Sequence, residues 1–289
     1  MPSLLSLSIG EAAGRRLMHV HQSGPDHATT PSREPIVAVS VEDRGGRPVM
    51  CGRFNMTTDP LTRLFMALVG QPFPGGDRLN VAPTETVPVI AAEDGDRRVA
   101  DMQWWLVPHW SKEPKTRYAT FNARSEKMAT SNAFRSPFLH RRCVVPVSGF
   151  YEWLTDADGR KQPHYVVPDD AEDGLVLAGL WDLWQGGHHH RLESFTLVTT
   201  AAHDSLRWLH DRQPVMLTRE EAELWLDADA DPEALLALCA SRIAVPLAVV
   251  PTSPRMNNSR FKDAACLEAV GEARHLAASA PSGEARDDA

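Results

Sequence analysis

Apolar and polar positions recur with two different periods along the middle of the chain, and together they predict a mixed fold. Strands are predicted where β-branched and aromatic residues are enriched, at 87–92, 99–107, 143–154, 175–184 and 194–200. A helix is predicted to begin at Asp59-Pro60, with Leu61, Leu64 and Leu68 on its apolar face. Further helices are predicted at 131–139, 203–209, 219–225 and 232–241. Strands joined by short turns, with helices inserted singly, indicate an α+β domain: a curved, mainly antiparallel β-sheet or barrel core with peripheral helices.

Composition divides the chain into three zones. Residues 1–49 are rich in Ser, Pro, Gly, His and charge, and only 36–41 has the pattern of a strand, so we expect a poorly structured N-terminal extension. Apolar periodicity continues from 50 to 271, which predicts one folded domain. From 272 to 289 Ala, Ser, Gly and Asp dominate, as is typical of a disordered tail.

The overall composition excludes several classes of protein. The 289 residues are 43% apolar and 24% charged, which is ordinary for a globular chain. Apolar runs fall far short of the roughly 18 residues that span a bilayer, and the first residues lack the zones of a secretory signal, so we expect a cytoplasmic protein with no membrane partner. The four cysteines are widely scattered and His188 to His190 follow two glycines, so we predict a plain loop there, with no disulfide framework and no metal site.

Charge is distributed unevenly around a net of −8. Between Lys115 and Tyr151 seven positive residues stand against one negative residue, whereas acidic residues gather at 220–233. Because nucleic-acid partners usually require a basic surface, the basic stretch fits a phosphate-binding surface. On charge alone it fits an ordinary solvated face equally well.

Met50 and Cys51 stand where the extension gives way to periodic sequence. If Met50 is the true start, its removal leaves Cys51 with a free α-amine beside its thiol, which is a 1,2-aminothiol. Such a group condenses with an aldehyde, because the amine forms a Schiff base and the thiolate then closes a thiazolidine ring. An α-amine with its ordinary pKa of about 7.7–8.0 keeps a useful neutral fraction at physiological pH. In isolation, the Met-Cys pair also fits an ordinary strand.

Eight short motifs follow one another along the chain. They are Met50–Phe54, Asn80–Pro83, Trp104–Trp110, Asn122–Glu126, Arg142–Pro146, Gly149–Trp153, Ala178–Trp181 and His210–Val215. Together they closely resemble the SOS-response-associated peptidase (SRAP) family of abasic-site processing proteins, over about residues 50 to 270. The resemblance implies a sensor of abasic sites in single-stranded DNA that bonds its amino-terminal cysteine to the ring-opened sugar aldehyde and shields the lesion during the DNA damage (SOS) response. It implies that no cofactor is needed and suggests a monomer.

The resemblance also assigns catalytic roles. Cys51 is the nucleophile, and Asn122 holds the nucleophile and the opened sugar with an amide that donates and accepts without titrating. Glu152 lies near the cysteine amine and moves protons. His210 acts as acid or base on the sugar ring oxygen.

A second set of residues is expected to contact DNA. Arg53, Arg124 and Arg212 are candidates for phosphate, and Pro83, Trp104 and Trp105 match positions where apolar groups wedge or stack against bases. Trp110, Trp153 and Trp181 are expected in the core. We assign no catalytic role to His109 or His164.

The 49 residues before Met50 depart from the family pattern, because a Cys51 amine that is blocked by a peptide bond cannot form the imine. Three explanations stay open: Met50 is the true start, the leader is removed by an autoproteolytic activity of Cys51 and Glu152, or the extension persists and the protein does not crosslink.

Two other functions also stay open. One is an amino-terminal-nucleophile hydrolase of the glutamine amidotransferase kind, which leaves the basic stretch unexplained. The other is a non-covalent module for single-stranded or modified DNA, which would survive Cys51→Ala.

Overall fold

The computed structural model describes residues 52–93, 95–170, 174–186 and 190–280. All of these described residues belong to one compact unit. The expectations for the N-terminal extension, for Cys51 and for 281–289 lie outside the described residues, as does most of the predicted histidine loop.

Strands dominate the described chain, and helices are short. The strands are β1 (Arg53–Met56), β2 (Arg78–Val81), β3 (Thr86–Glu93), β4 (Asp96–Trp104), β5 (Asn122–Arg124), β6 (Arg142–Val147), β7 (Gly149–Thr155), β8 (Lys161–Pro168), β9 (Leu175–Gln185), β10 (Arg191–Ala201), β11 (Arg212–Pro214), β12 (Met216–Leu217), β13 (Leu247–Pro251) and β14 (Arg274–Leu276). The helices are α1 (Thr58–Val69), α2 (Ser125–Met128), α3 (Arg135–His140), α4 (Arg219–Leu226) and α5 (Pro232–Ala237), with 3-10 turns η2 (Pro254–Asn257) and η3 (Ala264–Leu267).

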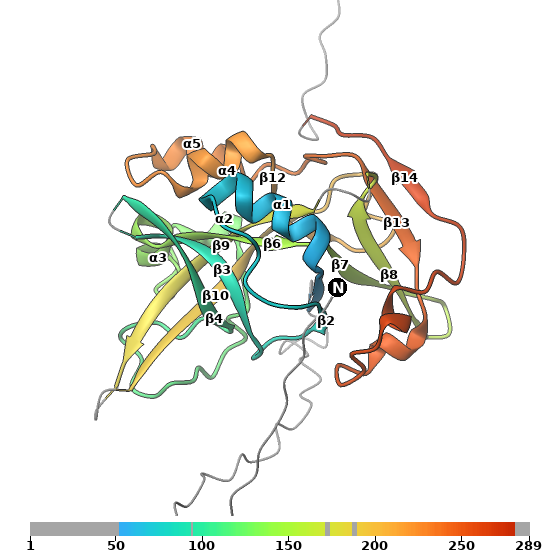
Figure 1. Cartoon of the computed structure of the whole chain (residues 1–289), viewed down its shortest axis with the longest axis horizontal. Helices are drawn as coiled ribbons and strands as arrows, with labels where there is room; N and C mark the ends of the chain where they lie inside the picture. The colour runs from blue at the N-terminus through green and yellow to red at the C-terminus, as the bar shows by residue number, and fades with distance from the viewer. Residues whose placement is uncertain (1–51, 94, 171–173, 187–189, 281–289) are drawn as a thin grey trace, which may run out of the picture. The chain divides into compact units, whose positions relative to one another are not determined.

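Five of the strands close into a barrel. β10 pairs with β9 on one side and with β4 on the other, and the order β10-β4-β3-β6-β9 completes the ring. A second sheet has the order β14-β13-β8-β7-β1-β2. Only the pairings of β10 with β4 and β5 are parallel among the described strands. The predicted α+β class with a mainly antiparallel core is therefore confirmed, and Figure 1 shows α1, α4 and α5 on one side of the barrel.

The chain passes from the barrel to the second sheet at Ser148. Sequence predicts one strand over 143–154, but β6 belongs to the barrel and β7 to the second sheet. The Ser148 amide donates to the Asn55 carbonyl at 2.8 Å, and its hydroxyl accepts from the Thr57 amide at 2.7 Å. These hydrogen bonds satisfy the backbone amides of Ser148 and Thr57 where the two sheets separate. Because apolar residues continue on both sides of Ser148, the sequence pattern does not reveal the break between β6 and β7.

Two other predictions need correction. Residues 203–209 form turns and no α-helix, because the His203 amide donates to the Gln213 side chain at 2.8 Å and the chain turns back toward β11. The tail predicted to be disordered from 272 contains β14, which pairs antiparallel with β13. Leu276 is the one buried side chain of that strand, so a single apolar contact and backbone pairing hold a segment without apolar periodicity.

Aromatic side chains fill the interior where the two sheets meet. Trp104 is fully buried, its ring centroid lies 4.7 Å from that of Phe54 on β1, and its indole N–H donates to the Phe121 carbonyl at 2.9 Å. Because Phe54 and Trp104 belong to different sheets, this contact ties the first strand of the second sheet to the barrel. Trp181 is also buried, as predicted.

Candidate functional site

The first described strand places the start of the folded chain beside Glu152. In the antiparallel pairing of β1 with β7, Arg53 stands opposite Tyr151. One residue further along this register, Gly52 falls opposite Glu152, whose side chain is 3% exposed. Cys51 is joined to Gly52 by a peptide bond and lies outside the described residues. A buried carboxyl group therefore stands where the chain leading from Cys51 enters the sheet.

His164 stands opposite Glu152 on β8, in a position that sequence reasoning set aside. Directly opposed residues of an antiparallel pair share one face of the sheet. The His164 side chain is buried, and desolvation lowers its pKa although a hydrogen bond to the Gln162 carbonyl opposes the shift. Its ring meets that of Trp208 edge-on at 5.4 Å. Trp208 lies in the turn that ends at His210. Through its contact with Trp208, His164 therefore links β7 and β8, the strands of Glu152 and His164, to the turn that carries His210.

His210 is held with one ring nitrogen engaged. Its side chain is 12% exposed, and Nδ1 lies 3.1 Å from the Arg212 amide and 2.9 Å from a carboxylate oxygen of Asp211. A neutral ring that accepts at Nδ1 carries its proton at Nε2. Nδ1 can therefore accept from the Arg212 amide, with the ring proton at Nε2, or carry a proton and donate it to the Asp211 carboxylate.

β10 brings Asn122, Arg124 and Arg212 onto neighbouring strands. Asn122 stands opposite Leu197 in the parallel pairing of β5, and Arg212 stands opposite Ala201 in the antiparallel pairing of β11. The Arg212 guanidinium donates to both carboxylate oxygens of Glu126 and to the Thr199 carbonyl. Burial acts to raise the pKa of Glu126, but the hydrogen bonds from Arg212, a backbone hydrogen bond and the charges of Arg212 and Arg124 together lower it. Arg124 is exposed, whereas Arg212 already has an anionic partner within the protein.

Arg53 is a half-buried cation with spare hydrogen-bonding capacity. Desolvation lowers its pKa, although the charge of Glu85 opposes the shift. The guanidinium carbon lies 5.9 Å from the ring centre of Trp153, and the buried Nε has no hydrogen-bond partner among the described residues. A buried donor without a partner is costly, so this guanidinium is suited to an anionic ligand.

The tryptophans do not all lie where sequence places them. Trp104 is fully buried, so the expectation that it stacks against bases is wrong: its ring packs on Phe54 and cannot reach a ligand without unpacking the core. Trp105 is half-buried and donates to Thr116, and Pro83 is half-exposed. Trp110 was expected in the core but is 57% exposed, because the chain has left β4 and lies in a surface segment. Trp153 is half-exposed and donates to Asn257.

The basic stretch divides into structural and surface cations. Arg142 is buried, and its guanidinium donates to the carbonyl oxygens of Phe138, Leu139, Trp225 and Asp227. Arg141 lies 3.3 Å from the buried carboxylate of Asp182. These two arginines hold the ends of α3 and α4 and a strand of the barrel. The remaining cations of the stretch are exposed at the surface: Lys115, Arg117, Arg124, Lys127 and Arg135.

The sequence profile of the SOS response associated peptidase (SRAP) family matches residues 50–259. The match covers more than half of the chain and includes every strand from β1 to β13. The chain belongs to the SRAP family. Its resemblance to that family, expected from the eight motifs, is thereby confirmed.

Similar SRAP proteins come from bacteria and vertebrates. The chain is 30% identical to "Abasic site processing protein YoqW" of Bacillus subtilis, over 65% of this chain and 86% of the relative. It is 29% identical to "Abasic site processing protein YoaM" of the same organism, over 76% of this chain and 98% of the relative. It is 32% identical to "Abasic site processing protein HMCES" of Xenopus tropicalis, over 66% of this chain and 65% of the relative. A solved protein from Bacteroides thetaiotaomicron shares the fold with a TM-score of 0.64 at 21% identity, covering 75% of this chain and 99% of the other.

Asn80 explains one SRAP motif in physical terms and points to residues that sequence reasoning missed. Its buried side-chain amide lies within 3.1 Å of the carbonyl oxygens of Met256, Asn258 and Phe261. Lys262 in turn donates to the Asn80 carbonyl at 2.7 Å. The segment held in this way carries Arg255, Arg260 and Lys262 within eight residues that contain no acidic side chain. That local run of positive charge was the signal available in the sequence.

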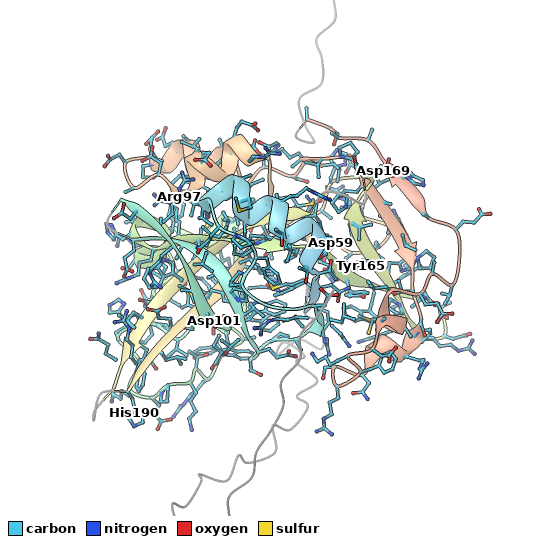
Figure 2. The ribbon with its side chains drawn as sticks, in the orientation of Figure 1. Asp59, Arg97, Asp101, Tyr165, Asp169 and His190 are labelled. Atoms are coloured by element: carbon cyan, nitrogen blue, oxygen red, sulfur yellow. The ribbon has the colours of Figure 1, made fainter. Side chains whose placement is uncertain are left out.

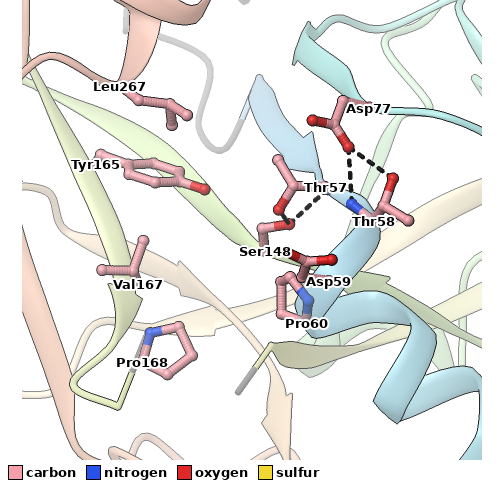
Figure 3. Close-up of a pocket in the computed structure, with 10 residues that line it drawn as sticks. All are labelled: Thr57, Thr58, Asp59, Pro60, Asp77, Ser148, Tyr165, Val167, Pro168 and Leu267. Atoms are coloured by element: carbon pink, nitrogen blue, oxygen red, sulfur yellow. Dashed lines mark hydrogen bonds between the residues drawn. The ribbon is translucent and has the colours of Figure 1, made fainter. Parts of the chain in front are cut away.

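A cavity of about 570 Å³ opens between the start of α1 and β8 (Figure 3), away from the residues that the family resemblance assigns to catalysis. Neither Asn122, Glu152 nor His210 lines it. Its wall includes Asp59 and Asp77, and Asp77 accepts from the amide and hydroxyl of Thr58, so the free end of the helix is already capped. Figure 2 shows Asp59 at that end of α1. Two carboxylates make this cavity unsuited to a phosphate ligand.

The described residues contain no cluster of three or more His, Cys, Asp or Glu that could bind a metal ion. Within the same residues, no helix has the length and apolar character needed to cross a membrane.

Proposed function

We propose that the protein senses abasic sites in single-stranded DNA and forms a covalent thiazolidine with them through an amino-terminal Cys51. Membership of the SRAP family and relatives named abasic site processing proteins support this proposal. The observation that carries it is the pairing of β1 with β7, which puts buried Glu152 opposite Gly52, the residue bonded to Cys51.

The reaction balances without an added reagent. The neutral α-amine of Cys51 adds to the aldehyde carbon of the ring-opened sugar, and the carbinolamine loses one water to give an imine. The thiolate then adds to the imine carbon while the ring nitrogen takes a proton. The product is a five-membered thiazolidine, and the net change is the loss of one water.

Glu152 and His210 move the protons in this scheme. Glu152 takes a proton from the attacking amine and returns it to the departing hydroxyl group. As an imidazolium whose Nδ1–H faces the Asp211 carboxylate, His210 gives its Nε2 proton to the sugar ring oxygen and returns to the neutral imidazole, while the anomeric hydroxyl releases its proton to water as the ring opens. Asn122 holds the open-chain sugar by donating and accepting hydrogen bonds.

Arg53 and Arg124 bind the phosphates on either side of the lesion. Arg53 offers a buried Nε donor with no partner among the described residues, and Arg124 stands exposed two residues after Asn122. Arg212 joins them only if phosphate displaces Glu126 from its guanidinium. Each phosphate contact releases counterions, so affinity falls as salt rises.

The mechanism requires a free amine on Cys51. Synthesis from Met50 followed by removal of that methionine supplies it. The alternative is an autoproteolytic step, in which Cys51 and Glu152 direct one water into the bond between Met50 and Cys51. Both routes lead to the same mature terminus.

The other cysteines of the fold do not compete for the aldehyde. Cys143, Cys239 and Cys266 are buried. Burial raises the pKa of all three thiols, that of Cys239 to about 12, which keeps them protonated and unreactive near neutral pH.

The test is adduct formation on a denaturing gel, with a single-stranded oligonucleotide that carries one abasic site. We compare the full chain with protein expressed from Met50, and each with Cys51→Ala, Glu152→Gln and His210→Gln. We expect a heat-stable adduct when Cys51 is amino-terminal, slower adduct formation in the Glu152 and His210 variants, and none with Cys51→Ala.

The controls separate the other candidate functions. With Cys51→Ala the amine alone can form an imine, so an adduct should appear only after borohydride reduction. A heat-stable adduct of Cys51→Ala without reduction would refute the thiazolidine. Undiminished DNA binding without any adduct would favour a non-covalent module, and release of ammonia from glutamine would favour a hydrolase.

A further inference from the structure

The last described strand lies beyond the part of the chain that the family profile matches. The profile ends at residue 259, whereas β14 (Arg274–Leu276) pairs with β13 at the edge of the second sheet (Figure 1). Of its three residues only Leu276 is buried. One buried side chain contributes little hydrophobic stabilisation, so the other contacts of residues 274–279 indicate what this C-terminal segment does.

Arg274 lies on the face of the second sheet that carries Glu152 and His164. It stands opposite Val249 on β13, and Val249 stands opposite Val166 on β8. Val166 follows His164 by two residues, so their side chains extend from the same face. His164 in turn stands opposite Glu152 on β7. The register therefore places the guanidinium and the buried carboxyl group on one side of the sheet.

Trp208 contacts two of the side chains on this face. Its ring meets that of His164 edge-on at 5.4 Å, and the guanidinium carbon of Arg274 lies 5.1 Å from its ring centre. A cation over a tryptophan ring is attracted by the π electrons of the ring. The Trp208 indole also donates to the Ser205 carbonyl at 2.9 Å, within its own turn. Arg274 therefore holds the turn of Trp208 against the sheet.

A second contact from the C-terminal segment holds the start of the same turn. The Ser279 hydroxyl lies 3.1 Å from Nε2 of His203, and the Ser279 amide pairs with the Ile243 carbonyl at 3.0 Å. At the other end of the turn the His210 amide donates to the Leu206 carbonyl at 3.2 Å. The backbone that carries His210 is thus fixed on both sides by residues that follow the family match.

We infer that residues 274–279 form a C-terminal clamp that positions His210 for proton transfer to the sugar, with Arg274 acting through Trp208. The inference rests on the proposed function, which assigns that proton transfer to His210. Residues 203–209 form turns, so tertiary contacts decide where the imidazole lies. A small displacement of a catalytic group is costly, because proton transfer requires the donor within hydrogen-bonding distance. Arg274 is a positioning residue, since it acts through another side chain.

The test is the rate of adduct formation over a range of concentrations of single-stranded DNA with one abasic site. The full chain and protein expressed from Met50 are compared, and the variants are made in the form that reacts. Arg274→Ala should lower the rate at saturating DNA about tenfold and change the half-saturating concentration less than about twofold. Arg274→Lys keeps a cation over the ring and should recover most of the rate. Ser279→Ala should lower the rate by a smaller factor.

Double variants show whether Arg274 acts through the residues named. In a Trp208→Leu background, and separately in a His210→Gln background, Arg274→Ala should cause little further loss of rate. A full additional loss in both backgrounds would overturn the clamp. A loss that lies wholly in the half-saturating concentration would also overturn it, because Arg274 would then be a DNA contact.

Two exposed positions provide matched controls. His275→Ala changes the next residue of β14, which extends from the opposite face of the sheet. Arg160→Ala removes the same charge from the turn between β7 and β8, where the side chain is 80% exposed. Both variants should keep the rate within about twofold of the wild type. An Arg274→Ala variant that reacts as fast as these controls would overturn the inference.

Hydrogen exchange of the turn distinguishes failure of the clamp from failure of the proposed function. The amides of Leu206, Leu209 and His210 donate to carbonyl oxygens of the same turn, and they should exchange faster in Arg274→Ala without any DNA. If the wild type forms no adduct while exchange accelerates in the variant, the covalent function fails and the contact of the clamp with the turn stands. If the adduct forms and the rate of the variant is unchanged, the clamp fails, whatever the exchange shows.

Discussion

Asn80 holds the basic segment that precedes η3, and its replacement should destabilise the whole domain. The side chain is fully buried, and its two amide hydrogens are shared among three carbonyl oxygens at 3.0–3.1 Å. Its backbone has φ 50, in the left-handed region that Asn and Gly tolerate better than other residues. Asn80→Ala therefore removes the hydrogen bonds and forces a Cβ-bearing residue without a polar side chain to keep a strained conformation.

The magnitude follows from these two contributions. Two buried hydrogen bonds at about 1 kcal/mol each give about 2 kcal/mol, and the left-handed backbone adds about 1 kcal/mol for Ala. We expect Asn80→Ala to lower the free energy of unfolding by about 3 kcal/mol. Asn80→Gly removes the amide but accepts the backbone, so it should cost about 2 kcal/mol.

The assay is urea unfolding, followed by circular dichroism and by tryptophan fluorescence to check that the two transitions coincide. Asn132→Ala, at an exposed position, is the control and should stay within about 0.5 kcal/mol of the wild type. The backbone amides of residues 255–262 should also exchange faster in both Asn80 variants. A loss below about 1 kcal/mol for Asn80→Ala would show that the three carbonyl contacts do not stabilise the domain, and a Gly variant less stable than the Ala variant would show that the left-handed backbone carries no cost.

Three further predictions concern stability, charge and pH. Arg142→Lys should lower the free energy of unfolding by about 2–4 kcal/mol and leave DNA affinity unchanged, because a lysine cannot reach the four carbonyl oxygens that the guanidinium contacts. Arg124→Lys should weaken DNA binding and leave stability unchanged. Calorimetry for stability and fluorescence anisotropy for DNA affinity, applied to both variants, check the two expectations. Gly149→Ala should cost about 1–3 kcal/mol in urea unfolding, because its Cβ would lie 2.6 Å from both the Val166 carbonyl and a methyl group of Val167; a wild-type midpoint would contradict this. Burial lowers the pKa of His164, so the unfolded chain takes up the proton first as pH falls. The contribution of His164 to the free energy of unfolding should therefore be complete above pH about 6.5 and decrease as pH drops below it. His164→Phe should flatten that part of the plot of Tm against pH, and an unaltered slope would contradict the role of His164 in it.

Local sequence patterns predicted the strands well because their residues are buried on at least one face. The segments 87–92, 175–184 and 194–200 lie within β3, β9 and β10. α4 also follows its prediction closely, since Thr218 and Glu221 form a capping box. In each case a local preference and the tertiary contacts favour the same structure.

Long-range contacts account for what the sequence alone did not predict. Trp104 and Trp110 stand in the same motif with similar apolar character, yet one packs against Phe54 from the other sheet and the other reaches solvent. Nothing within the motif distinguishes them. Similarly, Arg142 belongs to a run of positive charge, but carbonyl oxygens from α3 and from the end of α4 bury it. His164 was set aside because its place opposite Glu152 depends on the register of β7 with β8.

The most direct test of the central claim is the intact mass of the protein after incubation with single-stranded DNA that carries one abasic site. We expect a chain that begins at Cys51 and gains the mass of the oligonucleotide less one water, with the attachment mapped to Cys51 by peptide sequencing. An adduct on any other residue, or a chain with a free amino-terminal Cys51 that gains no DNA mass, would contradict it.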